Sequence, residues 1–82
     1  MRTPTKKHPE TSLIHKKIAT KIREKRISMH MSQRKFADFM HVTQATVSVW
    51  ESGRHNFSIS LLMYICEKIG LDFILEMGEG RK

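Results

Sequence analysis

A short polar run in the middle of the chain, TQATVS from Thr43 to Ser48, carries the most specific chemistry in this sequence. The side-chain amide of Gln44 offers a donor and an acceptor, which match N7 and N6 of adenine in the major groove of DNA. Ala45 is small enough to let the backbone approach, and its methyl group can touch a thymine methyl group. Ser48 lies one helical turn after Gln44 and can reach a base edge or a phosphate. Small polar residues at this spacing suit contact with a groove.

Two short helices joined by a tight turn are expected to position this run. Thr43 can cap the second of them, and Val47 and Trp50 share its inward face. Gly53 is a good residue to end it, because glycine adopts the left-handed conformation without a Cβ penalty. The residues that then project outward at its leading end are Gln44, Ala45, Ser48 and Val49.

The helix before the turn is expected to begin at Ser32. Its inward-facing residues are expected to be Phe36, Ala37, Phe39 and Met40. A preceding helix is predicted from Thr11 or Ser12, as N-cap, to about Arg26. The apolar residues that recur along it at helical spacing are Leu13, Ile14, Ile18, Ile22 and Ile27.

A fourth helix is predicted between Ser58, its N-cap, and Gly70, its stop. Its inward residues are expected to be Ile59, Leu62, Ile65, Cys66 and Ile69. The sequence therefore predicts an all-α fold of four to five short helices. We expect residues 11–70 to form the domain, after a disordered basic tail at 1–10 and before a C-terminal segment at 71–82.

The segment from Leu71 to Met77 alternates differently, since every odd position is apolar. That period of two favours a half-buried β-strand, and a fifth helix capped by Asp72 is the alternative. A lone strand would leave backbone groups unpaired, so we expect it to pair with its copy in a second protomer. The dimerisation residues would be Leu71, Phe73, Leu75 and Met77.

The charge and the cysteine content of the chain indicate what kind of partner and which compartment to expect. The net charge is +7, and residues 1–35 hold eleven of the fifteen lysines and arginines but only two of the eight acidic residues. A polyanionic partner is expected. Cys66 is the only cysteine, which excludes an internal disulfide and favours a buried thiol in a reducing cytoplasm. A signal peptide and a membrane span are not expected.

Metal, cofactor and catalytic chemistry find no support in the residue spacing. The chain has five histidines, and no two of them are at a spacing typical of metal ligands. They are His8, His15, His30, His41 and His55. No nucleophile–base arrangement, phosphate-cradling glycine loop or paired carboxylates are evident. We therefore expect neither an enzyme nor a bound metal, cofactor or small-molecule substrate.

From about Ile18 to Leu71 the sequence resembles the Cro/cI-type, or XRE, family of helix-turn-helix proteins, whose domain is lambda-repressor-like. The positions that carry the resemblance are Arg26, Ser32-Gln33, Phe36-Ala37, Val42-Thr43-Gln44, Val47-Ser48-Val49-Trp50-Glu51 and Gly53. Two positions depart from it. His41 stands where the family usually has glycine in the turn, and Phe57 stands where it often has proline.

The resemblance implies roles for several residues. Gln33 would bind phosphate and brace Gln44, and Arg26 and Glu51 would form a partly buried ion pair. The loop Arg54-His55-Asn56 would grip backbone phosphates. Thr43 and Thr46, with the helix N-terminal amides, would also set the register on the phosphates.

The function implied is a bacterial, cytoplasmic transcription regulator that binds double-stranded DNA. We expect a homodimer that represses from an inverted-repeat operator. The QATVS motif and the alternating segment at 71–77 are similar to HipB-type antitoxins, which also bind a kinase-like toxin. Phage-type repressors and restriction–modification controllers share the remaining pattern. A protein of a different class, whose main task is to neutralise a partner protein, is also open.

Overall fold

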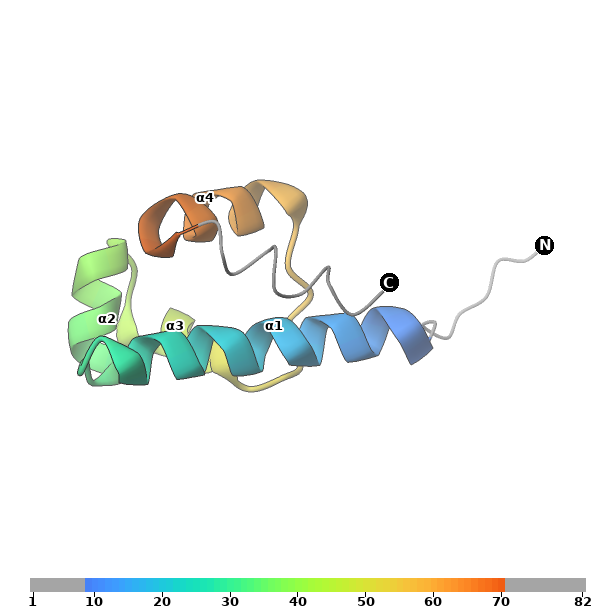
Figure 1. The fold of residues 1–82 in the computed structure, drawn as a ribbon, viewed down its shortest axis with the longest axis horizontal. Coiled ribbons are helices and arrows are strands. Elements are labelled where there is room, and N and C mark those ends of the chain that lie inside the picture. The colour runs from blue at the N-terminus through green and yellow to red at the C-terminus, as the bar shows by residue number, and fades with distance from the viewer. Residues whose placement is uncertain (1–8, 71–82) are drawn as a thin grey trace.

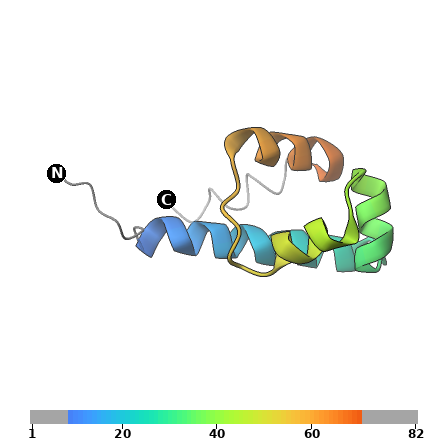
Figure 2. The same cartoon turned by 180° about the vertical axis from the view of Figure 1, so that it is seen from behind.

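The computed structural model describes residues 9–70, with side chains from residue 13 onward. This part of the chain folds into four α-helices and has no strand: α1 (Pro9–Ser28), α2 (Gln33–Met40), α3 (Gln44–Glu51) and α4 (Ile59–Ile69). Helix α1 runs the length of the molecule, α2 lies at its C-terminal end, and α4 extends above it (Figure 1). The view from behind shows α3 in front of α1 (Figure 2). The predicted all-α fold is confirmed.

Three of the four helices begin at the residues that the sequence predicted. The hydroxyl oxygens of Ser32, Thr43 and Ser58 each accept the backbone N–H of the residue three positions later, at 3.1 Å in all three cases. Each side chain thereby satisfies one of the N–H groups that a helix leaves unpaired at its start. These caps fix where α2, α3 and α4 begin.

Helix α1 is longer than predicted. It begins at Pro9 and ends at Ser28, so the expected N-cap at Thr11 or Ser12 was wrong, and two residues of the expected tail are helical. Proline is well suited to the first position of a helix, because the N–H that it lacks would have no helical partner there. The remainder of the expected tail, residues 1–8, lies outside the described residues.

The core gathers residues from all four helices and from the loop before α4. Its buried apolar side chains are Ile18, Ile22, Phe36, Ala37, Met40, Val47, Trp50, Phe57, Ile65, Cys66 and Ile69. Phe39 and Leu62, both expected inside, are partly buried against this cluster. Burial also raises the pKa of the Cys66 thiol, because the thiolate form is the more costly one to desolvate.

Several residues expected to face inward are exposed. Ile59, the first residue of α4, is 74 % exposed and Met63 is 65 % exposed, whereas Ile65 and Ile69 are buried. On α1, Leu13, Ile14 and Ile27 are about half exposed (53 %, 49 % and 50 %). They lie towards the two ends of a helix that extends beyond the core it covers.

The turn between α2 and α3 has a left-handed backbone at His41, the position where the family usually has glycine. His41 has φ +60° and its N–H bonds to the carbonyl oxygens of Ala37 and Asp38, which closes α2. His30, after α1, has the same conformation at φ +61°, which the sequence did not predict. Gly53, after α3, has φ +85°. Asn, Asp and His are the side chains that tolerate this region best after glycine.

The predicted dimerisation strand belongs to the C-terminal segment that follows α4. Residues 71–77, including Leu71, Phe73, Leu75 and Met77, lie outside the described residues. Within the described residues, no helix has both the length and the apolar character that crossing a membrane requires.

Candidate nucleic-acid interface

The leading end of α3 presents small polar side chains to solvent. Gln44, Ala45 and Ser48 are exposed, whereas Val47 and Trp50, on the opposite face, are 0 % and 2 % exposed. Thr43 and Thr46 both lie at the N-terminus of α3, and their hydroxyl oxygens are 2.8 Å apart, close enough to hydrogen bond. A helix N-terminus carries a partial positive charge and unpaired N–H groups, which suit a phosphate.

A bidentate ion pair fixes the far end of α3 to α1. Arg26 Nε donates to Glu51 Oε2 at 2.7 Å, and Arg26 Nη2 donates to Glu51 Oε1 at 3.1 Å. The side chains are 12 % and 5 % exposed, so the pair is shielded from solvent. The hydrogen bond to Glu51 is the main cause that raises the pKa of Arg26, and burial opposes it. A bidentate contact between a guanidinium and a carboxylate group fixes the relative orientation of the two side chains as well as pairing their charges.

The same arginine also reaches the turn before α2. Arg26 Nη1 donates to the carbonyl oxygen of Met31 at 2.9 Å. Gln33, the first residue of α2, donates from Nε2 to Glu51 Oε1 at 3.1 Å. The carboxylate of Glu51, on α3, thus connects this helix to α1 through Arg26 and to α2 through Gln33.

Gln33 therefore has a partner other than the one implied by resemblance. Its amide nitrogen is bound by Glu51, and among the described residues it has no hydrogen bond to Gln44. The Gln33 side chain is half-buried and the Gln44 side chain is exposed. The structure thus connects Gln33 to the ion pair, at the start of α2.

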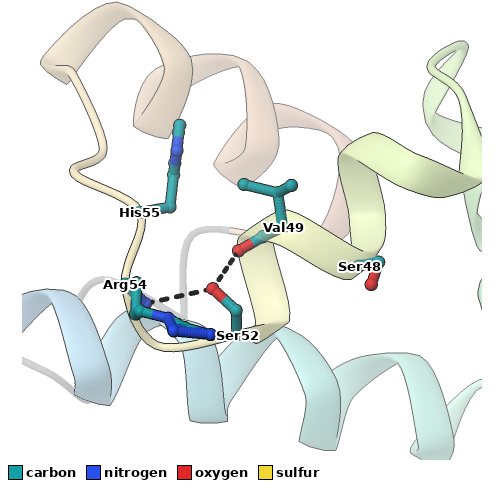
Figure 3. A pocket seen from close by; sticks show the side chains of 5 residues that line it. All are labelled: Ser48, Val49, Ser52, Arg54 and His55. Atoms are coloured by element: carbon teal, nitrogen blue, oxygen red, sulfur yellow. Dashed lines mark hydrogen bonds between the residues drawn. The ribbon is translucent and has the colours of Figure 1, made fainter.

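The loop after α3 borders the same surface. Ser52 donates its hydroxyl to the carbonyl oxygen of Val49 at 2.7 Å and accepts the N–H of Arg54 at 3.1 Å (Figure 3). An open hollow of about 360 Å³ is lined by Ser48, Val49, Ser52, Arg54 and His55. It brings a base-contact candidate of α3 next to two phosphate-contact candidates of the loop. Asn56 is exposed in the same loop.

Phe57 anchors this loop to α1. Its backbone N–H donates to His15 Nδ1 at 3.0 Å, and its ring lies against His15 and His55, with centroids 6.1 and 4.8 Å away. The proline common at this position in the family would lack that N–H. The departure at position 57 therefore provides a contact between the loop and α1.

Sequence reasoning missed His15 as part of the site. It lies 42 residues before its partner Phe57. No spacing pattern joins the two residues, because their contact depends on how the loop crosses α1. The part of the chain that the structure describes holds no group of three or more His, Cys, Asp or Glu residues that could bind a metal ion.

Two helices joined by a left-handed turn, with a polar exposed end on the second, define a helix-turn-helix DNA-binding domain. A comparison with family models agrees, since the helix-turn-helix model of the XRE type matches residues 22–74. The chain belongs to this family, whose members are DNA-binding regulators of transcription and whose domain is not an enzyme. Searches of curated proteins and of solved structures returned no match.

Proposed function

We propose that this protein is a repressor that binds an inverted-repeat operator as a homodimer. The observation that carries the proposal is the exposure of Gln44, Ala45 and Ser48 at one end of a helix whose other end is fixed by Glu51. A base-contacting side chain needs a rigid support, because small errors in position break its hydrogen bonds. The ion pair with Arg26 supplies such support.

The roles divide between the two ends of the interface. Gln44 would contact adenine with its amide, Ala45 would face a thymine methyl group, and Ser48 would reach a neighbouring base edge. The phosphate contacts would set register without specifying sequence. We assign them to Gln33, Thr43, Thr46, Arg54, His55 and Asn56.

The support for the proposed dimer comes from the sequence of the C-terminal segment. We propose that residues 71–77 pair with their copy through Leu71, Phe73, Leu75 and Met77, next to a DNA-binding domain at 11–70. Two copies related by a two-fold axis would place their recognition helices about 34 Å apart, one turn of DNA. Residues 1–10 would add a basic tail to the same DNA.

Selection of bound sequences from a random DNA pool tests this function directly. The expected result is an enriched inverted repeat, with the centres of its half-sites about one helical turn apart. A single unrepeated site would contradict the homodimer. No enrichment over the starting pool would contradict sequence-specific binding, and would favour a protein whose task is to hold a partner polypeptide.

We further propose that the regulated operon encodes a toxin–antitoxin pair of the HipBA kind, with this protein as antitoxin and autorepressor. The support is the QATVS motif at residues 44–48 and the alternating segment that follows Gly70. Co-expression with the product of an overlapping downstream kinase-like gene should yield a stable complex. If the neighbouring gene is instead a divergent lytic-control gene or a restriction enzyme, a phage-type repressor or a restriction–modification controller is the better assignment.

A further inference from the structure

One edge of α1 follows α3 and the loop after it. Arg26 binds Glu51 at the end of α3, and His15 binds the N–H of Phe57 in the loop. The loop crosses α1 in the view from behind (Figure 2). Residues at intervals of three and four share a helix face, so the edge next to α3 also includes Lys16, Ala19 and Arg23.

Lys16 lies directly against the loop. A Cβ atom placed on Gly53 would stand 3.8 Å from Lys16 Cγ, so the aliphatic stem of the lysine covers that glycine. The residue as a whole is nevertheless exposed. A lysine with a packed stem keeps its ammonium group in solvent. The glycine that this stem covers directly precedes Arg54 in the loop.

Arg23 lies two turns further along the same edge and is also exposed. Within the residues that the structure describes, neither Lys16 nor Arg23 forms an ion pair or a side-chain hydrogen bond. Glu24 is the only acidic residue between positions 13 and 28, and it faces Lys21 at 3.9 Å. Among the side chains of α1 that the structure describes, none neutralises the charges of Lys16 and Arg23.

We propose that Lys16 and Arg23 form a second row of contacts to DNA phosphates, next to the row formed by the loop. The proposal rests on the function proposed above and extends it to a helix outside the helix-turn-helix. Seven residues of helix separate the two cations by about 10 Å along the axis. Two cations this far apart can each meet a different phosphate of one strand, so the pair fits a polyanion and not a single small anion.

Variants that remove the charge of Lys16 or Arg23 but keep an unbranched aliphatic side chain test the proposed phosphate contacts. Lys16→Met removes the charge and preserves packing on Gly53. Lys17→Met is the matched control, because Lys17 is the next residue of α1 and is exposed on the outward face of that helix. Binding to a mixed-sequence DNA duplex is followed by fluorescence anisotropy over a series of salt concentrations. Thermal unfolding followed by circular dichroism checks that each variant folds.

One lost phosphate contact should lower the slope of log affinity against log salt by about 0.9. If the salt lines converge near 1 M, Lys16→Met should bind about eight-fold more weakly at 0.1 M salt, and Arg23→Met similarly. Lys16→Arg should retain the wild-type slope, because it keeps the charge. Lys17→Met should retain it too.

Two results would overturn the second row. Wild-type affinity and slope in Lys16→Met would show that the ammonium does not meet phosphate. Equal losses in Lys16→Met and Lys17→Met would show a long-range effect of net charge only. Failure of the wild-type protein to bind any duplex would instead remove the proposed function itself, and that outcome is visible before a variant is made.

Discussion

Gln44 concentrates the sequence specificity of the proposed interface in one side chain. It is the first residue of α3, directly after the Thr43 cap, and nothing in the described part of the chain covers it. The backbone N–H of Thr46 is already bound by the Thr43 hydroxyl at 3.1 Å, which holds the first turn in place. An amide so positioned can form two hydrogen bonds with one adenine, and no phosphate contact can replace that pattern.

Replacing Gln44 by alanine should therefore separate specific from non-specific binding. We expect a loss of about 1–3 kcal/mol on the selected operator and almost none on mixed-sequence DNA. Titrations of both duplexes at one salt concentration measure the difference. Ser60→Ala, an exposed change on α4, serves as control. Equal losses on both duplexes would assign Gln44 to the DNA backbone.

At the scale of the helices, the ion pair between α1 and α3 is the main polar contact that orients the motif. Glu51 is 5 % exposed, and Arg26→Ala would leave it with Gln33 as its one remaining side-chain hydrogen-bond partner among the described residues. Removing one member of a buried pair typically costs about 3 kcal/mol or more. We expect a marked fall in the urea midpoint and weaker binding to DNA. Arg23→Ala, an exposed arginine on the same helix, should leave the midpoint unchanged, and a midpoint unchanged in both variants would refute the structural role of the pair.

The contact between His15 and the loop is the second such constraint. His15→Phe keeps a ring against Phe57 but removes the acceptor for its half-buried N–H, at a cost of about 1–3 kcal/mol. We expect lower stability and weaker binding to operator and mixed-sequence DNA alike, because the loop positions phosphate contacts and no base contacts. His15→Asn, which keeps an acceptor near the position of Nδ1, should recover part of both. A purely packing role predicts wild-type behaviour in His15→Phe.

For the whole molecule, the decisive property is whether two domains act together on one operator. A chain that ends at Gly70 keeps the described helices and loses the segment to which we assign dimerisation. In sedimentation at micromolar concentration we expect the full chain to be a dimer and the shortened chain a monomer. The monomer should bind a single half-site as weakly as the full chain does, and should lose the advantage that the paired site confers. A shortened chain that remains a dimer would move the interface into residues 9–70.

Local features were predictable because their causes lie within a few residues. The caps at Ser32, Thr43 and Ser58 depend on a hydroxyl and an N–H three positions apart, and the sequence shows both. The inward stripe of Val47 and Trp50 follows from helical periodicity, which also placed Gln44 on the outer side. The sequence alone thus determined the helices of the motif and the side chains at its exposed end.

Tertiary structure decided what joins those helices and how far the core extends. Periodicity shows that Leu13, Ile14 and Ile59 are apolar positions, but only the lengths and crossing of neighbouring helices decide whether anything covers them. Likewise, His15 meets Phe57, and Gln33 meets Glu51, across 42 and 18 residues. Such contacts depend on how the whole chain folds, and no spacing rule within one helix encodes them.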